Sequence, residues 1–167
     1  FSDCKSLIQI AIPFSVTFIG ETAFADCESL KKVLFDSPTS SASIENNSVY
    51  ECSSLERKII PPGIFYRCSS LTQILIPSSV NSIGDMAFYG CSSITQILIP
   101  SSINSFGNNI FDGIKTLEII GDIKYIPDTL FKGCTSLDQI SIPSSVTEIG
   151  NSAFEGCSSL TQISIPS

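Results

Sequence analysis

Apolar and polar positions alternate along this chain in one phrase that returns from end to end. From Phe65 the phrase reads Phe-x-x-Cys-Ser-Ser-Leu-Thr-Gln-Ile-Leu-Ile-Pro-Ser-Ser-Val-x-x-Ile-Gly-x-x-Ala, and the next copy begins 23 residues later, at Phe88. Such a period is typical of solenoids, in which each copy is one coil that buries its apolar side only against its neighbours. The pattern predicts about seven coils of mostly 23 residues. Copies start at Phe1, Phe24, Tyr50, Phe65, Phe88, Phe111, Phe131 and Phe154.

The Leu-x-x-Ile-x-Ile part of each copy predicts a short strand. Its last isoleucines, such as Ile74 and Ile76, alternate with an outward position, which is the period of a half-buried strand. A proline such as Pro77 follows at once and lacks the backbone donor that would continue the ladder. We therefore expect short parallel strands, about 4.8 Å apart, to stack into one sheet along the solenoid.

The rest of each copy predicts turns and a short helical segment on the other side. Ile83 returns as an apolar anchor, and Gly84 and Gly150 are expected to mark sharp bends. Phe88 and Cys91 are three residues apart, which is compatible with a single helical or 3₁₀ turn packing inward.

Three copies depart from the phrase. The second is lengthened by a Ser-rich run, and the third is shortened to 15 residues. The copy from Phe111 lacks three residues and carries Ile114 in place of cysteine. The sequence therefore predicts a single repeat solenoid over residues 1–167, irregular at 36–64 and slightly so at 111–130. If the coils continue through 36–64, that region must bend or tilt the stack. Neither end has a polar capping repeat, so we expect a fragment of a longer array or ends that meet another chain.

Cysteine occupies one fixed position of the phrase. Zinc sites need cysteine pairs two to four residues apart, and no such pair occurs here. Stacked coils would bring successive cysteines close enough for disulfides, but the count of seven is odd and Ile114 takes the position in one copy. We expect free thiols packed as small apolar groups. The structural ladder would consist of Cys4, Cys27, Cys68, Cys91, Cys134 and Cys157, with Cys52 in the irregular region.

Composition excludes several classes of function. The chain has no histidine, which removes the Ser-His and Cys-His hydrolases. A net charge of −7 with scattered basic residues argues against nucleic acid or an anionic membrane as partner. No apolar run reaches the roughly 20 residues of a membrane helix, and the acidic residues lack calcium-loop spacing. We expect no enzyme activity, cofactor, metal site or membrane insertion in this segment.

Outward positions of the predicted strands are the candidates for binding. A repeated glutamine there has two interpretations, an amide ladder that supports the sheet or a face that recognises a partner. At a neighbouring outward position, leucines either form an exposed stripe that marks an interface, or they cover one another or are covered by the irregular loop near residues 36–49. Leu34 belongs to this second group. The candidate partner-binding face consists of Thr72, Gln73, Leu75, Thr95, Gln96, Leu98, Gln139 and Gln162.

The phrase Phe-x-x-Cys-x-x-Leu-x-x-Ile-x-Ile-Pro-x-x-Val-x-x-Ile-Gly-x-x-Ala resembles the BspA-like leucine-rich repeat. The resemblance covers nearly the whole chain and is loosest in the copies from Phe24, Tyr50 and Phe111. Proteins of that family are surface proteins of oral and gut bacteria and of parasitic protists such as trichomonads, implicated in adhesion.

The resemblance implies a right-handed leucine-rich-repeat solenoid and a non-catalytic, protein-binding role. It also implies a cell-surface or secreted location, although this segment shows no signal or anchor, and a host matrix or cell-surface protein as the partner. An intracellular scaffold that assembles proteins through the same face is the alternative. Self-association through the ends or the side of the solenoid is a further alternative.

Overall fold

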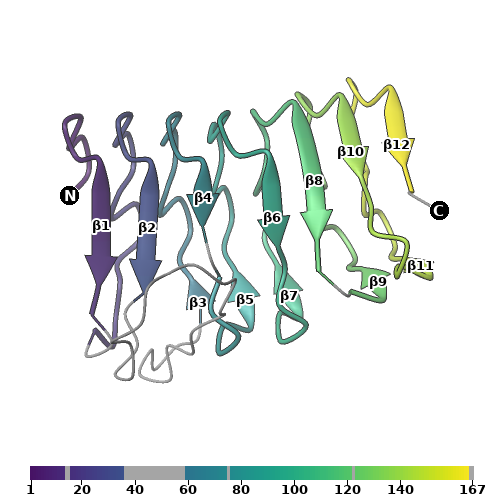
Figure 1. The fold of residues 1–167 in the computed structure, drawn as a ribbon, viewed down its shortest axis with the longest axis horizontal. Helices are drawn as coiled ribbons and strands as arrows, with labels where there is room; N and C mark the ends of the chain where they lie inside the picture. Colours follow the sequence, from purple (N-terminus) through teal and green to yellow (C-terminus); the bar gives the residue numbers. More distant parts are fainter. Residues whose placement is uncertain (14–15, 36–58, 75, 122, 166–167) are drawn as a thin grey trace.

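Parallel strands stacked side by side form the structure (Figure 1). The computed structural model describes the chain except for residues 14–15, 36–58, 75, 122 and 166–167. Each coil contributes one strand to a first row, where the sequence predicted it. These strands are β1 (Gln9–Ile12), β2 (Lys32–Phe35), β4 (Gln73–Ile74), β6 (Gln96–Leu98), β8 (Thr116–Ile120), β10 (Gln139–Ser141) and β12 (Gln162–Ser164).

A second row of shorter strands runs beside the first and was not predicted. Its strands are β3 (Ile59–Ile60), β5 (Ser82–Ile83), β7 (Ser105–Phe106), β9 (Tyr125–Ile126) and β11 (Glu148–Ile149). They pair in parallel, with Ile83 opposite Phe106 and Ile126 opposite Ile149. A strand of two residues is too short to show alternation, so the sequence indicated only an apolar anchor before a bend.

All pairings between coils are parallel, and this confirms the predicted solenoid of stacked parallel strands. The first row is hydrogen-bonded in the orders β1-β2-β4 and β6-β8-β10-β12, and β4 lies beside β6 in Figure 1. The second row is hydrogen-bonded in the orders β3-β5-β7 and β9-β11.

The register of the first row shifts by two residues across β8. On one side Gln96 of β6 lies opposite Glu118, whereas on the other side Gln139 of β10 lies opposite Thr116. Leu117 and Ile119 both point inward and are buried, so each continues the apolar row of one neighbour. The solenoid accommodates the shortened copy at 111–130 through β8, the longest strand of the first row.

In the second row, the pairing is interrupted between β7 and β9. Elsewhere a glycine after the strand donates its N–H to the preceding coil, as Gly107 does to Ile83 O and Gly150 to Ile126 O, both at 2.8 Å. Pro127 occupies the equivalent position after β9 and has no N–H to donate. Among the described residues, β7 and β9 therefore end two separate sheets.

The prediction of a helical or 3₁₀ turn around each repeat phenylalanine is wrong for the described coils, which form hydrogen-bonded turns instead. In one coil, Tyr66 N donates to Gly63 O at 2.9 Å and Cys68 N to Phe65 O at 3.1 Å. Gly63 and Arg67 flank the phenylalanine with φ of +59° and +56°, a left-handed conformation that a helix cannot contain. The N–H groups of Gly63, Phe65 and Arg67 donate to the next coil at 2.9, 3.0 and 2.7 Å. Bonds between coils thus replace bonds along a helix.

The expected copy beginning at Tyr50 does not separate its two neighbours in the stack. Tyr50 itself lies outside the described residues. The rings of Phe24 and Phe65 are 5.8 Å apart, and Cys68 Sγ donates to Phe24 O at 3.0 Å. Strand β2 pairs directly with β4. The described parts of the coils from Phe24 and Phe65 are therefore direct neighbours, where the sequence predicted another coil between them.

Close contact between coils, rather than a bend of the backbone, explains the repeated glycine of the phrase. Gly84, Gly107 and Gly150 lie outside the left-handed region, which corrects the expected reason for Gly84 and Gly150. A Cβ on Gly107 would collide with the backbone N of Asp85, and one on Gly150 would lie 2.6 Å from Asp128 N. No side chain larger than the hydrogen of glycine therefore fits between the coils at Gly107 and Gly150.

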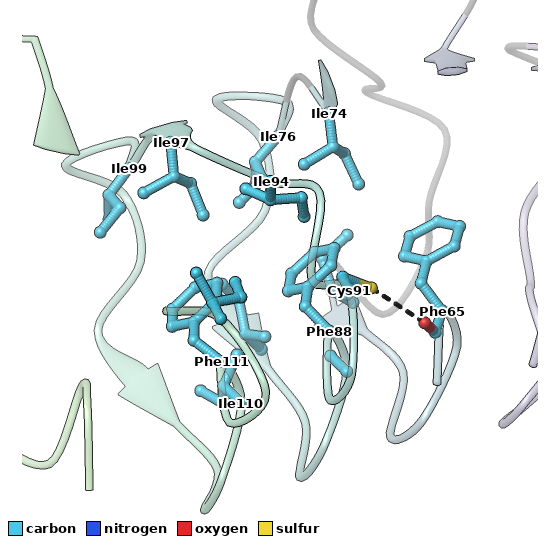
Figure 2. Close-up of a cluster of buried hydrophobic side chains, with 14 of the residues drawn as sticks. Phe65, Ile74, Ile76, Phe88, Cys91, Ile94, Ile97, Ile99, Ile110 and Phe111 are labelled. Carbon is cyan, nitrogen blue, oxygen red and sulfur yellow. Dashed lines mark hydrogen bonds between the residues drawn. The ribbon is translucent and has the colours of Figure 1, made fainter. Parts of the chain in front are cut away.

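The core is a set of ladders that follow the solenoid axis. Successive repeat phenylalanines lie with ring centroids 5.2 to 5.8 Å apart, and Figure 2 shows Phe65, Phe88 and Phe111 beneath the strand isoleucines. Most ring pairs are stacked, but Phe111 and Phe131 are tilted by 40°, next to the shortened copy. The coils thus share one continuous apolar core.

Candidate binding face

The cysteines lie inside the solenoid beside the phenylalanine ladder. Cys27, Cys68, Cys91 and Cys134 are buried, Cys4 and Cys157 are half-buried, and all six have free thiols. The thiols of Cys27, Cys68, Cys91 and Cys157 donate hydrogen bonds to the repeat phenylalanine of the preceding coil, as Cys91 Sγ does to Phe65 O at 3.1 Å (Figure 2). Their place is structural, and the seventh, Cys52, is outside the described residues.

Burial makes these thiols poor nucleophiles and poor metal ligands. It raises the pKa of Cys68 and of Cys134 from 9.0 to about 12, and it also raises the pKa of Cys91. The neighbouring thiol of the ladder adds to the shift, while a hydrogen bond with the preceding coil opposes it. Within the described part of the chain, no group of three or more His, Cys, Asp or Glu side chains is arranged to hold a metal ion.

Several acidic side chains away from the strand face tie coils together. Asp85 Oδ1 accepts the N–H of Asn108 at 2.6 Å, and Asp128 Oδ1 accepts the N–H of Asn151 at 2.7 Å. Asp112 Oδ1 accepts the N–H of Ser136 at 3.0 Å. These carboxylates bond to backbone donors of the next coil, so they are part of the scaffold.

The structure brings most of the predicted face residues to one side of the first row. Thr72, Thr95, Gln96, Gln139 and Gln162 are exposed. Leu75 and the side chain of Gln73 lie outside the described part. Gln139 is directly opposite Gln162 in the pairing of β10 with β12, so glutamines do occupy successive strands there.

The leucines beside these glutamines do not form an exposed stripe where they are described. Leu34 and Leu98 are half-buried. A Cβ on Gly121 would lie 2.6 Å from Leu98 Cδ1, so the Leu98 side chain covers the turn that follows β8. These two half-buried leucines give no open apolar patch, and a role of the leucine position in binding stays a prediction.

Charged residues interrupt the glutamine row, and the sequence reasoning missed them. Lys32 of β2 stands opposite Gln9, and Glu118 of β8 stands opposite Gln96. Gln96 Nε2 donates to Glu118 Oε2 at 2.6 Å, so this glutamine bonds to a carboxylate and not to another amide. Lys32 was visible by counting from its copy's phenylalanine, but the place of Glu118 depends on the register shift.

A depression of about 290 Å³ opens on the face over β8 and its neighbours. Threonine, serine and glutamine dominate its outward side chains, with Glu118 as the acidic member. The lining residues are Thr95, Gln96, Thr116, Leu117, Glu118, Gln139, Ile140, Ser141, Gln162 and Ser164.

A second hollow, of about 180 Å³, lies where the second row is interrupted between β7 and β9. Its lining is more apolar than that of the depression over β8 and includes Ile99, Ile103, Ile123, Tyr125 and Pro127.

A solenoid of this kind, with a buried ladder on one side of each strand and a row of exposed polar side chains on the other, defines a leucine-rich-repeat scaffold. No helix in the described part is long and apolar enough to cross a membrane. The model of the BspA type leucine-rich repeat region matches residues 1–64 and 58–167, in six copies. The chain belongs to this family, which confirms the resemblance that its repeat phrase indicated and points to no catalytic family.

The chain is similar in fold to a solved leucine-rich repeat structure, and two further solved structures are similar at lower TM-scores. The chain is 22% identical to a leucine-rich repeat protein of T. pallidum, covering 96% of this chain and 68% of that one with a TM-score of 0.56. A leucine-rich repeat protein of Bacteroides ovatus is 28% identical, with 92% and 47% covered and a TM-score of 0.46. A leucine-rich cell surface protein of Faecalibacterium prausnitzii is 19% identical, with 96% and 79% covered and a TM-score of 0.34.

The chain thus spans from about half to about four-fifths of the length of these neighbours. No curated protein sequence matches the chain.

Proposed function

We propose that this chain is a non-catalytic protein-binding module of a cell-surface adhesion protein, which contacts a host matrix or cell-surface protein through the outward side of its first-row strands. The observation that carries the proposal is the row of exposed polar side chains on successive strands, opposite a fully apolar interior. Leucine-rich repeat proteins generally bind proteins, and an extended sheet built from repeats offers a long surface for this. The proposed face consists of Thr72, Gln73, Leu75, Thr95, Gln96, Leu98, Gln139 and Gln162.

Two features of the chain favour binding over catalysis. It lacks histidine, which is the common general base, and burial raises the pKa of Cys68 and of Cys134, so these two described thiols are not activated nucleophiles. The exposed amides and hydroxyls of the strand face are groups that make hydrogen bonds to a partner without chemical change.

The face is tested with the double variant Thr95→Arg/Gln139→Arg and the matched control Asn104→Arg/Ser144→Arg. All four positions are exposed, and both variants add two positive charges, but only the first pair belongs to the proposed face, with Thr95 directly before β6 and Gln139 in β10. Binding to immobilised collagen, laminin and fibronectin is measured by surface plasmon resonance. We expect binding by the parent chain and the control, and at least a tenfold loss for the strand-face variant.

Equal loss in both double variants would refute the strand face as the contact surface. Absence of binding to all three matrix proteins would count against adhesion to matrix. An antibody against this segment, applied to intact and to permeabilised cells of the source organism, distinguishes the alternative. Staining only after permeabilisation would favour an intracellular scaffold over a surface protein.

A further inference from the structure

Glu118 lies between two unlike neighbours on the strand face. The register shift of β8 makes Gln96 its partner on β6 and Ser141 its partner on β10. Gln96 donates a hydrogen bond to Glu118 Oε2, and this bond holds the carboxylate on the side of β6. The described residues give Oε1 no hydrogen-bond donor. The carboxylate therefore keeps acceptor capacity toward the depression.

Space beside Glu118 comes from small side chains. Ser141 and Ser164 line the hollow and occupy the outward position that Leu98 occupies on β6, so smaller side chains border it on β10 and β12. Thr116 and Gln139, which lie opposite each other, border the same space and add a hydroxyl and an amide. A side chain that enters there meets oxygen atoms on several sides.

The charge of this depression is negative. Glu118 is the one ionisable residue that lines it, and the other lining residues are neutral. A cation is the complementary ligand, since an anion would meet Glu118 without a basic residue among the lining residues. The absence of further carboxylates in the lining argues for an organic cation, because Ca²⁺ needs six to eight oxygen ligands and usually several carboxylates.

From these contacts we infer that the depression over β8 binds an arginine side chain of the partner protein, a site that rests on the proposed function of the strand face. Glu118 receives the guanidinium, and the oxygens of Thr116, Gln139 and Ser141 accept its remaining N–H groups. Arginine fits better than lysine because its planar group carries five donors in a fixed fork, whereas an ammonium offers three at one point. Such a contact sets the register of a partner along a face of otherwise similar strands.

The test uses two peptides with blocked ends, Gly-Ser-Arg-Ser-Gly and the same peptide with citrulline, the neutral isostere of arginine. Each is titrated into the ¹⁵N-labelled chain, and amide signals of the strand face are followed by NMR. The variants are Glu118→Gln and, as a matched control, Glu148→Gln, which neutralises another exposed strand carboxylate in the second row. Thermal unfolding is compared to verify that both variants fold.

We expect the arginine peptide to shift the signals of Gln96, Gln139 and Ser141, with an affinity about fivefold weaker after Glu118→Gln, the upper range for an exposed ion pair. Glu148→Gln should leave the affinity unchanged, and the citrulline peptide should bind no better to the parent chain than to Glu118→Gln. Equal responses to arginine and citrulline, or shifts that map elsewhere, would overturn the arginine site. A lysine peptide that binds as well as the arginine peptide would overturn the guanidinium contact.

Failure of this site and failure of the proposed function give different results. If the matrix-binding assay identifies the strand face but the peptide titration is negative, only the arginine site is lost. If the titration is positive but the strand-face variant binds matrix proteins like its control, the role of the face in adhesion is lost.

Discussion

Replacing Phe88 with alanine tests whether the phenylalanine ladder carries the stability of the solenoid. Phe88 is fully buried and lies between Phe65 and Phe111, with ring centroids 5.6 and 5.7 Å apart. Removing a buried phenylalanine ring costs about 3–5 kcal/mol, which includes the cavity that remains. Because neighbouring coils hold the backbone on both sides, the site has little freedom to collapse, and we expect the upper half of that range.

Phe1→Ala is the matched control in the same ladder. Phe1 is 74% exposed and stacks on one neighbour, Phe24, with centroids 5.6 Å apart. The small buried area and the single ring contact together predict a cost of about 1 kcal/mol.

Urea unfolding followed by far-UV circular dichroism measures both free energies. Amide hydrogen exchange shows whether Phe88→Ala opens the middle of the stack locally, which a repeat array permits because each coil contacts only its neighbours. The reasoning fails if the two variants lose the same free energy of unfolding, since burial and double stacking would then not decide the cost.

The same structure makes two further predictions. Gly107→Ala should lower the free energy of unfolding by about 2 kcal/mol or more. Gly20→Ala, at the equivalent position where a Cβ meets nothing within 4 Å, should lower it by less than about 0.5 kcal/mol. Equal losses in urea unfolding would exclude close contact as the reason for this glycine. The contribution of the buried thiols to the free energy of unfolding should be fully present below pH 9 and fall as the pH rises toward 12. The folded chain raises the pKa of Cys68 and Cys134 to about 12, so it binds their protons more tightly than the unfolded chain does. Each shift corresponds to at most about 4 kcal/mol, so Cys134→Val should reduce the alkaline loss in pH-dependent unfolding, and an unchanged pH profile would refute this account.

Much of the fold was predictable because the apolar positions of the repeat phrase correspond to the side chains that point into the core. The Ile-x-Ile alternation and the following proline identified the first-row strands, and the fixed phenylalanine identified the ladder. The turns around that phenylalanine were not predictable from spacing alone, since three residues between Phe88 and Cys91 suit a 3₁₀ turn as well as a reverse turn. The difference lies in residues such as Met86, which has a φ of +54° and donates its N–H to Asn108 O of the next coil at 2.9 Å.

The insertion after β2 shows a limit of counting copies. Cys52 and the tyrosine before it reproduce enough of the phrase to predict a separate coil, yet Phe24 stacks on Phe65. Which copies become neighbours is decided by ring contact and strand pairing across 41 residues, as in the bond from Thr72 Oγ1 to Lys31 O. The sequence therefore located the irregular region but not the coils that it separates.

The candidate face was predicted in part for the same reason. Counting from each phenylalanine located Gln96, Gln139 and Gln162, which lie on regular coils. Glu118 stands one place before the glutamine position of its copy, so counting assigned it to the threonine position. The shortened coil moves it opposite Gln96, and only the pairing of β6 with β8 reveals this neighbour.

Specificity on such a face has to come from the places where the repeat fails. Identical glutamines on successive strands offer a partner the same contact in several registers, so they add affinity without fixing one position. The two-residue shift of β8 places a carboxylate between Gln96 and Ser141 and creates one location that no other described coil reproduces. The three residues missing from the copy that starts at Phe111 thus have a consequence beyond packing. They place an acidic side chain opposite Gln96 in the described glutamine row, and a partner's register can be set from that point.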